Sequence, residues 1–330
     1  MNLKVFFTKL FQLRFPWPIK ILVTALVVYL VNKSFTKDQL ALIVEGISII
    51  PLSVAFILWC LSLYCVVKRW RLMLGIWGIP VNDLSALRTM LWGCLLAFLT
   101  PGRVGEFFRG VSLSPLKKRN SVLAVLMEKL FAAGAILIFG AVCCAISLSR
   151  NGSACWLQAV ILLGLAAVMI GGGIFFMMRK AALVRHALEG MPALSKQQTI
   201  ALVFYSVFAH FFLIGQTAVL LSMFGSNDFM NNIVTSGQAY TFMLFFPFFI
   251  ANMGIREYSF GMFLSCGPAK FHAVGFPAIA LGASMGILII NIVLPALAGL
   301  VWWLVEKKKV ASCQLPVTSK SNSTTGNWQL

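Results

Sequence analysis

The sequence predicts an all-α, polytopic transmembrane bundle with about six full spans and two re-entrant helical hairpins, because three observations agree. The chain of 330 residues is 60% hydrophobic and only 11% charged, and its mean hydropathy is +0.90. Several apolar runs reach the roughly 20 residues that a helix needs to cross a hydrocarbon core about 30 Å thick. Two other apolar stretches are interrupted by glycine, proline or asparagine together with charged residues.

The first two spans are placed by hydropathy and by their basic flanks. Residues 17–35 are expected to cross outward, because basic residues precede them and the positive-inside rule puts such residues in the cytoplasm. A cleaved signal peptide is the alternative, but no small-residue cleavage site follows this run. Residues 47–67 are expected to return to the cytoplasmic side, which a basic cluster marks. This cluster contains Lys68, Arg69 and Arg71.

The next apolar run, residues 84–99, leads into the sequence TPGRVGEFFRG at residues 100–110. Basic residues flank this region on both sides, so both of its ends are expected to be cytoplasmic. A segment that enters and leaves on one side and is broken in its middle predicts a re-entrant hairpin. Two short full spans are the alternative. The break is expected at Pro101, Gly102 and Gly105.

The second half of the chain repeats this organisation. Residues 225–237 contain Asp228 and no Lys or Arg, which suits an outer loop. Residues 238–266 form a second interrupted stretch, with its break at Asn252 and Gly254. If the last apolar run is one kinked span, both termini are cytoplasmic and the two hairpins enter from opposite faces, as in an inverted repeat. The remaining spans are expected at residues 121–148, 155–178, 199–224 and 274–305.

Charged residues within these apolar segments form the candidate site. A charge near the centre of a bilayer costs about 2.5 to 3.5 kcal/mol on insertion scales, so such a side chain usually faces a cavity or a partner. We expect the arginines to bind a lipid phosphate through paired N–H donors, and the glutamates to orient them or to exchange protons. Helix N-termini at the two breaks would add positive dipole ends. The candidate residues are Arg103, Glu106, Arg109, Glu128, Lys129, Arg256 and Glu257.

The alternative is that these charges form ion pairs that only stabilise the hairpins. Arg109 would then extend to the cytoplasmic headgroups. The order of Gly, Arg, Glu and an aromatic residue around both Glu106 and Glu257 indicates instead a weak internal repeat, whose two copies contribute to one central site. His210, within an apolar run, either relays protons or is a hydrogen-bonded histidine of the bundle.

Four motifs together resemble a known family. They are KRWRLMLGIWGI at residues 68–79, PGRVGEFFRG at 101–110, VLMEKL at 125–130 and NMGIREYSFG at 252–261. These motifs are similar to those of the transmembrane domain family of lysylphosphatidylglycerol synthases, also called flippase-like membrane proteins. The resemblance runs from the first span to about Lys309. It implies two re-entrant helices around a central cavity and a role in moving an anionic or glycosylated lipid across the bacterial inner membrane.

Two features depart from the pattern of that family. Lys129 stands where the family commonly has an arginine, so the two-pronged geometry of a guanidinium is missing there. Full-length synthases of the family carry a soluble aminoacyltransferase domain after the membrane part. Here the transmembrane domain at residues 1–309 is followed by residues 310–330, a polar tail that is expected to be disordered and cytoplasmic. Lysylation of lipids is therefore not expected.

The composition and the motifs favour a transporter over an enzyme. A transferase needs a nucleophile, a base or a metal set, and no such motif is present in a chain with nine acidic residues. We expect no catalytic residues, no cofactor and no metal site, and as partners anionic or polyprenyl-linked lipids rather than nucleic acid. A membrane-embedded accessory subunit or a transferase of an envelope lipid or glycan pathway is the alternative. A homo-oligomer or a complex with envelope-pathway enzymes stays open.

Overall fold

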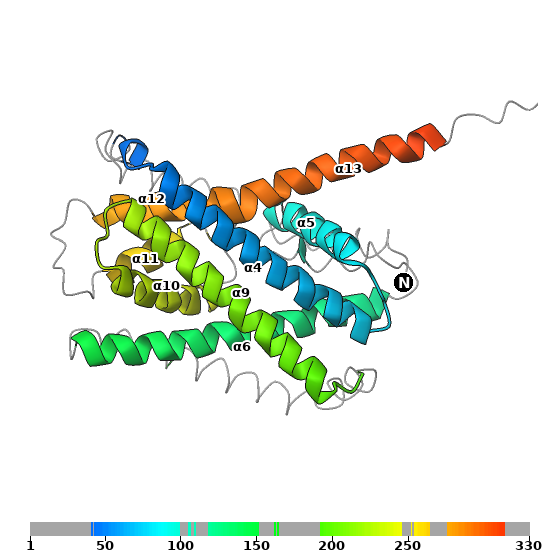
Figure 1. Ribbon diagram of the computed structural model, residues 1–330, viewed down its shortest axis with the longest axis horizontal. Helices are drawn as coiled ribbons and strands as arrows, with labels where there is room; N and C mark the ends of the chain where they lie inside the picture. Colours follow the sequence, from blue (N-terminus) through cyan, green and yellow to red (C-terminus); the bar gives the residue numbers. More distant parts are fainter. Residues whose placement is uncertain are drawn as a thin grey trace, which may run out of the picture.

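All regular structure in the described residues is helical (Figure 1). The computed structural model describes residues 41, 43–99, 105–106, 109, 118–151, 162, 164, 192–245, 252, 254–264 and 276–313. The helices are α4 (Ile49–Ile76), α5 (Asp83–Leu99), α6 (Lys118–Asn151), α9 (Lys196–Met223), α10 (Phe229–Leu244), α11 (Ile255–Leu264), α12 (Phe276–Leu288), η4 (Ile289–Val293) and α13 (Leu294–Cys313). The predicted span at 17–35, nearly all of 155–178, and Pro101, Gly102 and Arg103 lie outside the described residues.

Four helical segments of the described chain are long and apolar enough to cross a membrane. They are Ile49–Ile76, Val122–Arg150, Lys196–Met223 and Ala278–Trp302. These segments overlap four of the predicted spans, so the all-α membrane class is confirmed for this part of the chain. The last segment runs without interruption through α12, η4 and α13, and the π-helical η4 lies inside the run expected to be one kinked span. The total of six spans and the re-entrant hairpins stay predictions.

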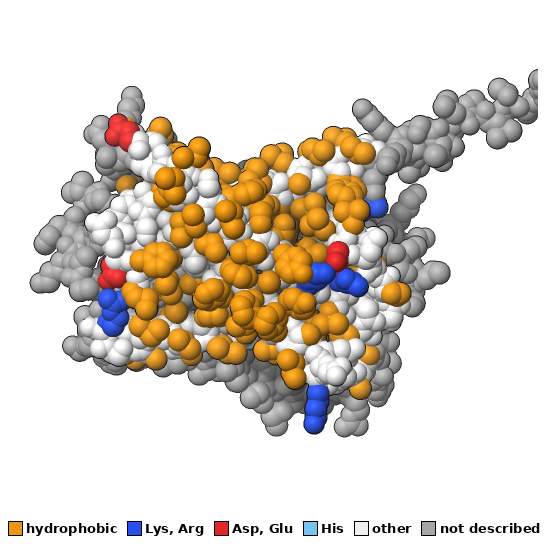
Figure 2. All heavy atoms as spheres, viewed as in Figure 1, with side chains coloured by type: hydrophobic (Ala, Val, Ile, Leu, Met, Phe, Trp, Pro, Cys, Tyr) orange, Lys and Arg blue, Asp and Glu red, His pale blue; other side chains and the backbone are white. Residues whose placement is uncertain are grey.

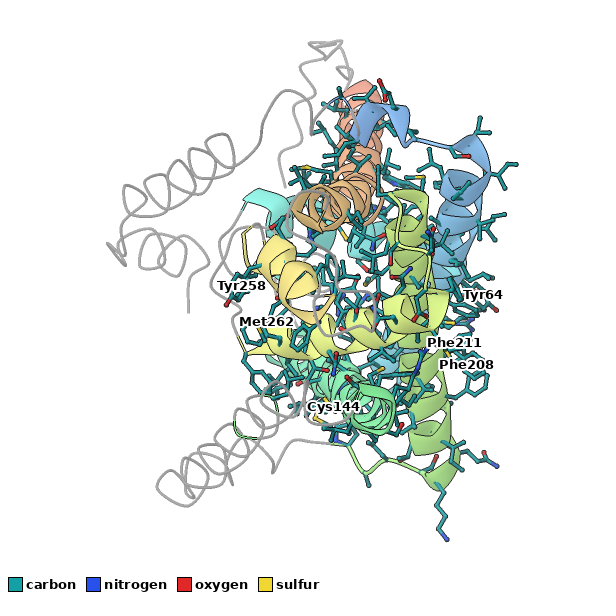
Figure 3. The ribbon with its side chains drawn as sticks, turned by 90° about the vertical axis from the view of Figure 1, so that its left-hand side faces the viewer. Tyr64, Cys144, Phe208, Phe211, Tyr258 and Met262 are labelled. Atoms are coloured by element: carbon teal, nitrogen blue, oxygen red, sulfur yellow. The ribbon has the colours of Figure 1, made fainter. Side chains whose placement is uncertain are left out.

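Helices α4 and α9 pack against each other and run in opposite directions (Figure 1). They are tied by a hydrogen bond of 2.9 Å from Ser62 Oγ to the carbonyl of Ala209. Their outer faces are apolar, and Tyr64 and Phe208 point away from the bundle, whereas Tyr258 of α11 lies on the opposite side (Figure 3). An apolar outer face with buried polar side chains inside is the arrangement that a lipid solvent requires.

Charged side chains on the face shown in Figure 2 gather toward the ends of the bundle, with an apolar band between them. At one end Lys68 and Arg71 bind Asp83. At the other end Arg150 Nη2 lies 3.4 Å from Asp228 Oδ2. The basic cluster and the turn after α9 therefore lie at opposite ends of the helices. Which end faces the cytoplasm stays a prediction.

The predicted outer loop at residues 225–237 is wrong in its extent, because α10 begins at Phe229. The turn is short: Gly225 has φ +105°, and the carboxylate of Asp228 caps α10 by accepting from the amide of Asn231 at 2.9 Å. Polar residues of the predicted loop are buried along α10 instead. They include Asn231, Asn232, Thr235 and Ser236.

The buried polar face of α10 is tolerated because most of its groups find partners. Asn232 Nδ2 donates to Ser222 Oγ at 2.9 Å and to the carbonyl of Ser226 at 3.1 Å. Close approach to α6 is made possible by Gly237, where a Cβ atom would overlap the sulfur of Cys143. By local propensity, a run of Asn, Ser and Thr indicates a loop. In this protein the run is helical, because hydrogen bonds to neighbouring helices satisfy side chains along it.

After α5 the chain folds back along the same helix. Gly105 lies against the backbone of Leu96 and Ala97, and Arg109 lies further back, with its side chain 3.0 Å from the position of a Cβ on Gly93. The contacts of Gly105 and Arg109 therefore run in antiparallel order along α5. The re-entrant hairpin itself, with its break at Pro101, Gly102 and Gly105, stays a prediction.

We expect Gly105→Ala to lower the free energy of unfolding by about 1–3 kcal/mol, because the added methyl would overlap main-chain atoms that cannot rotate away. That Cβ would lie 2.6 Å from the amide nitrogen of Ala97. Gly75→Ala in α4 is the matched control, because a Cβ there meets no atom within 4 Å. Thermal unfolding in detergent compares the two, and equal midpoints for Gly105→Ala and the wild type would contradict this packing.

Candidate functional site

The centre of the candidate site is Glu128 of α6, whose two carboxylate oxygens bind two arginines. Arg69 of α4 binds Oε1 and Arg109, from the segment that returns along α5, binds Oε2. All three residues are buried, with 1% of Glu128, 4% of Arg69 and 2% of Arg109 exposed. Three separate parts of the chain thus meet at one carboxylate inside an apolar bundle. We call Arg69, Arg109, Glu128, Glu106 and Lys129 the Glu128 network.

Both guanidinium groups are held in orientation by further contacts. Arg69 Nη1 donates to Ser206 Oγ of α9 at 3.2 Å. Arg109 Nη1 lies 2.7 Å from the sulfur of Met90, and its guanidinium carbon lies 4.2 Å from the ring centroid of Trp70. Stacking on an aromatic face suits the planar guanidinium and leaves its edge for anions.

A second pair lies beside this carboxylate. Lys129 Nζ binds Glu106 Oε2, and the lysine side chain is 40% exposed whereas the glutamate is 6% exposed. Among the described residues, the Glu128 network therefore contains three cationic and two anionic side chains, which leaves one positive charge in excess. This net positive charge, with the partly exposed Lys129 at its edge, favours the binding of an anion.

Two buried nitrogens near the Glu128 network have no acceptor or donor among the described residues. They are Nε of Arg69 and Nδ1 of His210. His210 lies on α9 one turn beyond Ser206, which binds Arg69. Buried polar atoms usually have a partner, so these two atoms indicate a place where a ligand or water completes the hydrogen bonding.

The second broken segment forms its own polar cluster. Asn252 has φ 57° and Gly254 has φ 85°, so both predicted break residues adopt the left-handed conformation just before α11 begins at Ile255. Glu257 accepts from the amide of Gly254, which caps the start of α11. Arg256 is 2% exposed, lies 3.4 Å from Glu257, and donates through Nε to the hydroxyl of Ser284 in α12.

The structure gives the two glutamates different partners. Glu106 binds Lys129 of α6, whereas Glu257 binds Arg256 beside it and Ser284 of α12. Among the described residues no ion pair or hydrogen bond joins the Glu128 network to the cluster of Arg256, Glu257 and Ser284. A single site shared by both broken segments therefore stays a prediction. Arg109 and Glu106 each form an ion pair with α6, and Arg256 forms one with Glu257.

Arg69 is the functional candidate that sequence reasoning missed. It was assigned to the basic cytoplasmic cluster, whereas only Lys68 and Arg71 belong to the partly exposed face. The spacing along α4 indicates that Arg69 is buried, because it lies one turn from both Cys65 and Met73, which are buried. Ser206 and Ser284, which bind the buried arginines, carry no comparable signal in the sequence.

Within the described residues no group of three His, Cys, Asp or Glu side chains could hold a metal ion.

Comparison with known proteins identifies the family. The family described as Lysylphosphatidylglycerol synthase TM region matches residues 17–299, which include both broken segments and the Glu128 network. Searches of curated proteins and of solved structures gave no match.

Proposed function

Since the chain belongs to the family of the lysylphosphatidylglycerol synthase TM region, we propose that it binds the anionic headgroup of a membrane lipid at the Glu128 network and moves that lipid across the membrane. In this proposal it is a transporter and not an enzyme. It resides in the bacterial inner membrane with both termini cytoplasmic, and its two broken segments are re-entrant hairpins that open the site to either face.

The observation that carries the proposal is the net positive charge of the Glu128 network, in which three cationic side chains meet two carboxylates. A phosphodiester headgroup carries one negative charge and would neutralise this excess. Guanidinium groups bind phosphate through paired N–H donors, and Nε of Arg69 is buried with no acceptor among the described residues.

An apolar groove leads from the lipid-facing surface to this charge. It is a cavity of about 320 Å³ between α6 and α9, and its lining includes Leu130, Phe131, Ile138, Val203 and Ser206. Ser206 also accepts the hydrogen bond from Arg69. A lipid whose acyl chain lies in the groove would therefore have its headgroup next to the Glu128 network. The charge of the headgroup would then not pass through the hydrocarbon core of the membrane.

Purified protein in vesicles tests this function. Phosphatidylglycerol that carries a fluorescent acyl chain is placed in both leaflets, and dithionite is added outside to bleach the outer leaflet. We expect the protected inner fraction to become bleachable in vesicles that contain the protein, and to stay protected in protein-free vesicles. A protected fraction that is equal in both would contradict transport. Mass spectrometry of the same lipid tests the transferase alternative, because a transferase changes its mass.

A further inference from the structure

A second cavity lies at the basic end of the bundle, away from the Glu128 network. It measures about 520 Å³ and lies between the last turns of α4, the turn that follows it, and the first turns of α9. Lys68 and Arg71 contribute its cationic side chains, whereas Arg69 between them points into the bundle. Further lining residues are Gly75, Ile76, Gln198 and Tyr205.

The two cations of this cavity share one carboxylate. Asp83 accepts from Lys68 Nζ at 2.7 Å and from Arg71 Nη1 at 3.0 Å. The hydrogen bond from Lys68 and, to a smaller extent, the one from Arg71 hold the pKa of Asp83 below its usual range. The carboxylate is therefore charged at neutral pH. One positive charge remains in excess. Among the described residues nothing accepts from the other nitrogens of Arg71, which is half exposed.

The remaining walls of the cavity fit a lipid better than a soluble anion. Leu72, Ile76 and Val81 line it, so most of its surface is apolar. Tyr64 lies one turn before Lys68 with its ring centroid 5.3 Å from Nζ, and it points outward from α4 (Figure 3). Tyrosine and lysine together at the end of an apolar span are typical of the headgroup level of a membrane.

We propose that this cavity binds the phosphate-bearing headgroup of an anionic phospholipid, whose acyl chains lie along the exposed apolar face of α4 and α9. Arg71 and Lys68 contact the phosphate, and the amide nitrogen of Gln198 is placed for a further hydrogen bond, because its oxygen already accepts from the amide of Ser195. The site lies outside the Glu128 network, so lipid can bind here whether or not the protein transports lipid.

Native mass spectrometry of the purified full chain measures this binding, with dioleoyl phosphatidylglycerol as the probe. Dioleoyl phosphatidylcholine, which has a phosphate but no net charge, is the comparison. Arg71→Gln should weaken binding of phosphatidylglycerol about fivefold, since one cation near an anionic lipid contributes about that factor. Asp83→Asn should strengthen it by a similar factor, because the competing carboxylate is removed. Gly75→Leu should also weaken it, because a Cβ at Gly75 meets open space and a leucine side chain would fill the cavity.

The control is Ala145→Leu, which also introduces a leucine, at an exposed position of α6 that does not line the cavity. It should leave binding unchanged. Competition by millimolar inorganic phosphate would assign the site to a soluble anion and overturn the lipid assignment. Equal affinity of the wild type, Arg71→Gln and Asp83→Asn for phosphatidylglycerol would overturn the site itself. Neither result depends on translocation, so failure of this proposal is distinct from failure of the transport function.

Discussion

Replacement of Glu128 by glutamine is expected to lower the free energy of unfolding by about 3–5 kcal/mol, because it leaves two buried arginines without their shared carboxylate. Arg69 and Arg109 bind different oxygens of this one side chain, and both are almost fully buried. An amide keeps the shape and one acceptor but removes the negative charge. The midpoint of thermal unfolding of the purified protein in detergent measures the effect.

Asp83 offers a matched control for this experiment, because it also binds two cations through its two oxygens. It lies at the surface with 47% of its side chain exposed, whereas Glu128 is 1% exposed. Water and salt screen exposed pairs, so Asp83→Asn should change the unfolding midpoint little. If the two substitutions had similar effects, burial would not be what makes the Glu128 network important to the fold.

Arg109→Lys is expected to reduce lipid translocation at least about tenfold while the protein still inserts and folds. Arg109 binds Glu128 and the sulfur of Met90 with one planar group that stacks on Trp70. Lysine keeps the charge but presents a single ammonium, which cannot hold the carboxylate and a phosphate in the same fixed geometry. The initial rate of dithionite bleaching in reconstituted vesicles measures the loss.

Arg150→Lys serves as the control for Arg109→Lys. It makes the same chemical change in an exposed ion pair with Asp228, at the far end of α6. It should transport lipid at the wild-type rate. Wild-type transport by Arg109→Lys would favour the alternative in which these ion pairs only stabilise the hairpins.

The sequence was informative where hydropathy and charge agree. Long apolar runs with basic flanks identified the spans now seen as α4, α6 and α9. Charges inside apolar segments predicted that Glu106, Arg109 and Glu128 face a cavity or a partner, and each of them is buried in an ion pair. Both kinds of inference depend only on the free energy of transfer between water and lipid, which local sequence determines.

The sequence was less informative where partners come from distant helices. Arg69 lies between Lys68 and Arg71, and only the packing of α4 against α6 and α9 separates its role from theirs. The buried polar helix α10 looked like a loop for the same reason. Its hydrogen-bond partners lie on other elements, and no local pattern shows that such partners exist.

The relation between the two breaks shows a further limit of local patterns. The repeat in sequence around Glu106 and Glu257 predicts a common site, yet the glutamates bind Lys129 and Arg256 respectively. Similar motifs fix the chemistry of each segment but not the distance between them. Coupling between Glu106→Gln and Glu257→Gln, as a departure from additivity of about 0.5–3 kcal/mol, would show one shared network.

If the cations of the Glu128 network bind the negative charge of the lipid while it crosses the membrane, the protein prefers a lipid with net negative charge. The most direct measurement is the ratio of the translocation rates of phosphatidylglycerol and phosphatidylcholine that carry the same fluorescent acyl chain, for the wild type and for Arg69→Gln. We expect the wild type to move the anionic lipid at least about tenfold faster, because the choline cation of phosphatidylcholine cancels the charge of its phosphate and would lie beside the excess positive charge. The ratio should fall toward one in Arg69→Gln, which removes that excess. Equal rates for the two lipids in the wild type, or an unchanged preference in Arg69→Gln, would contradict this mechanism.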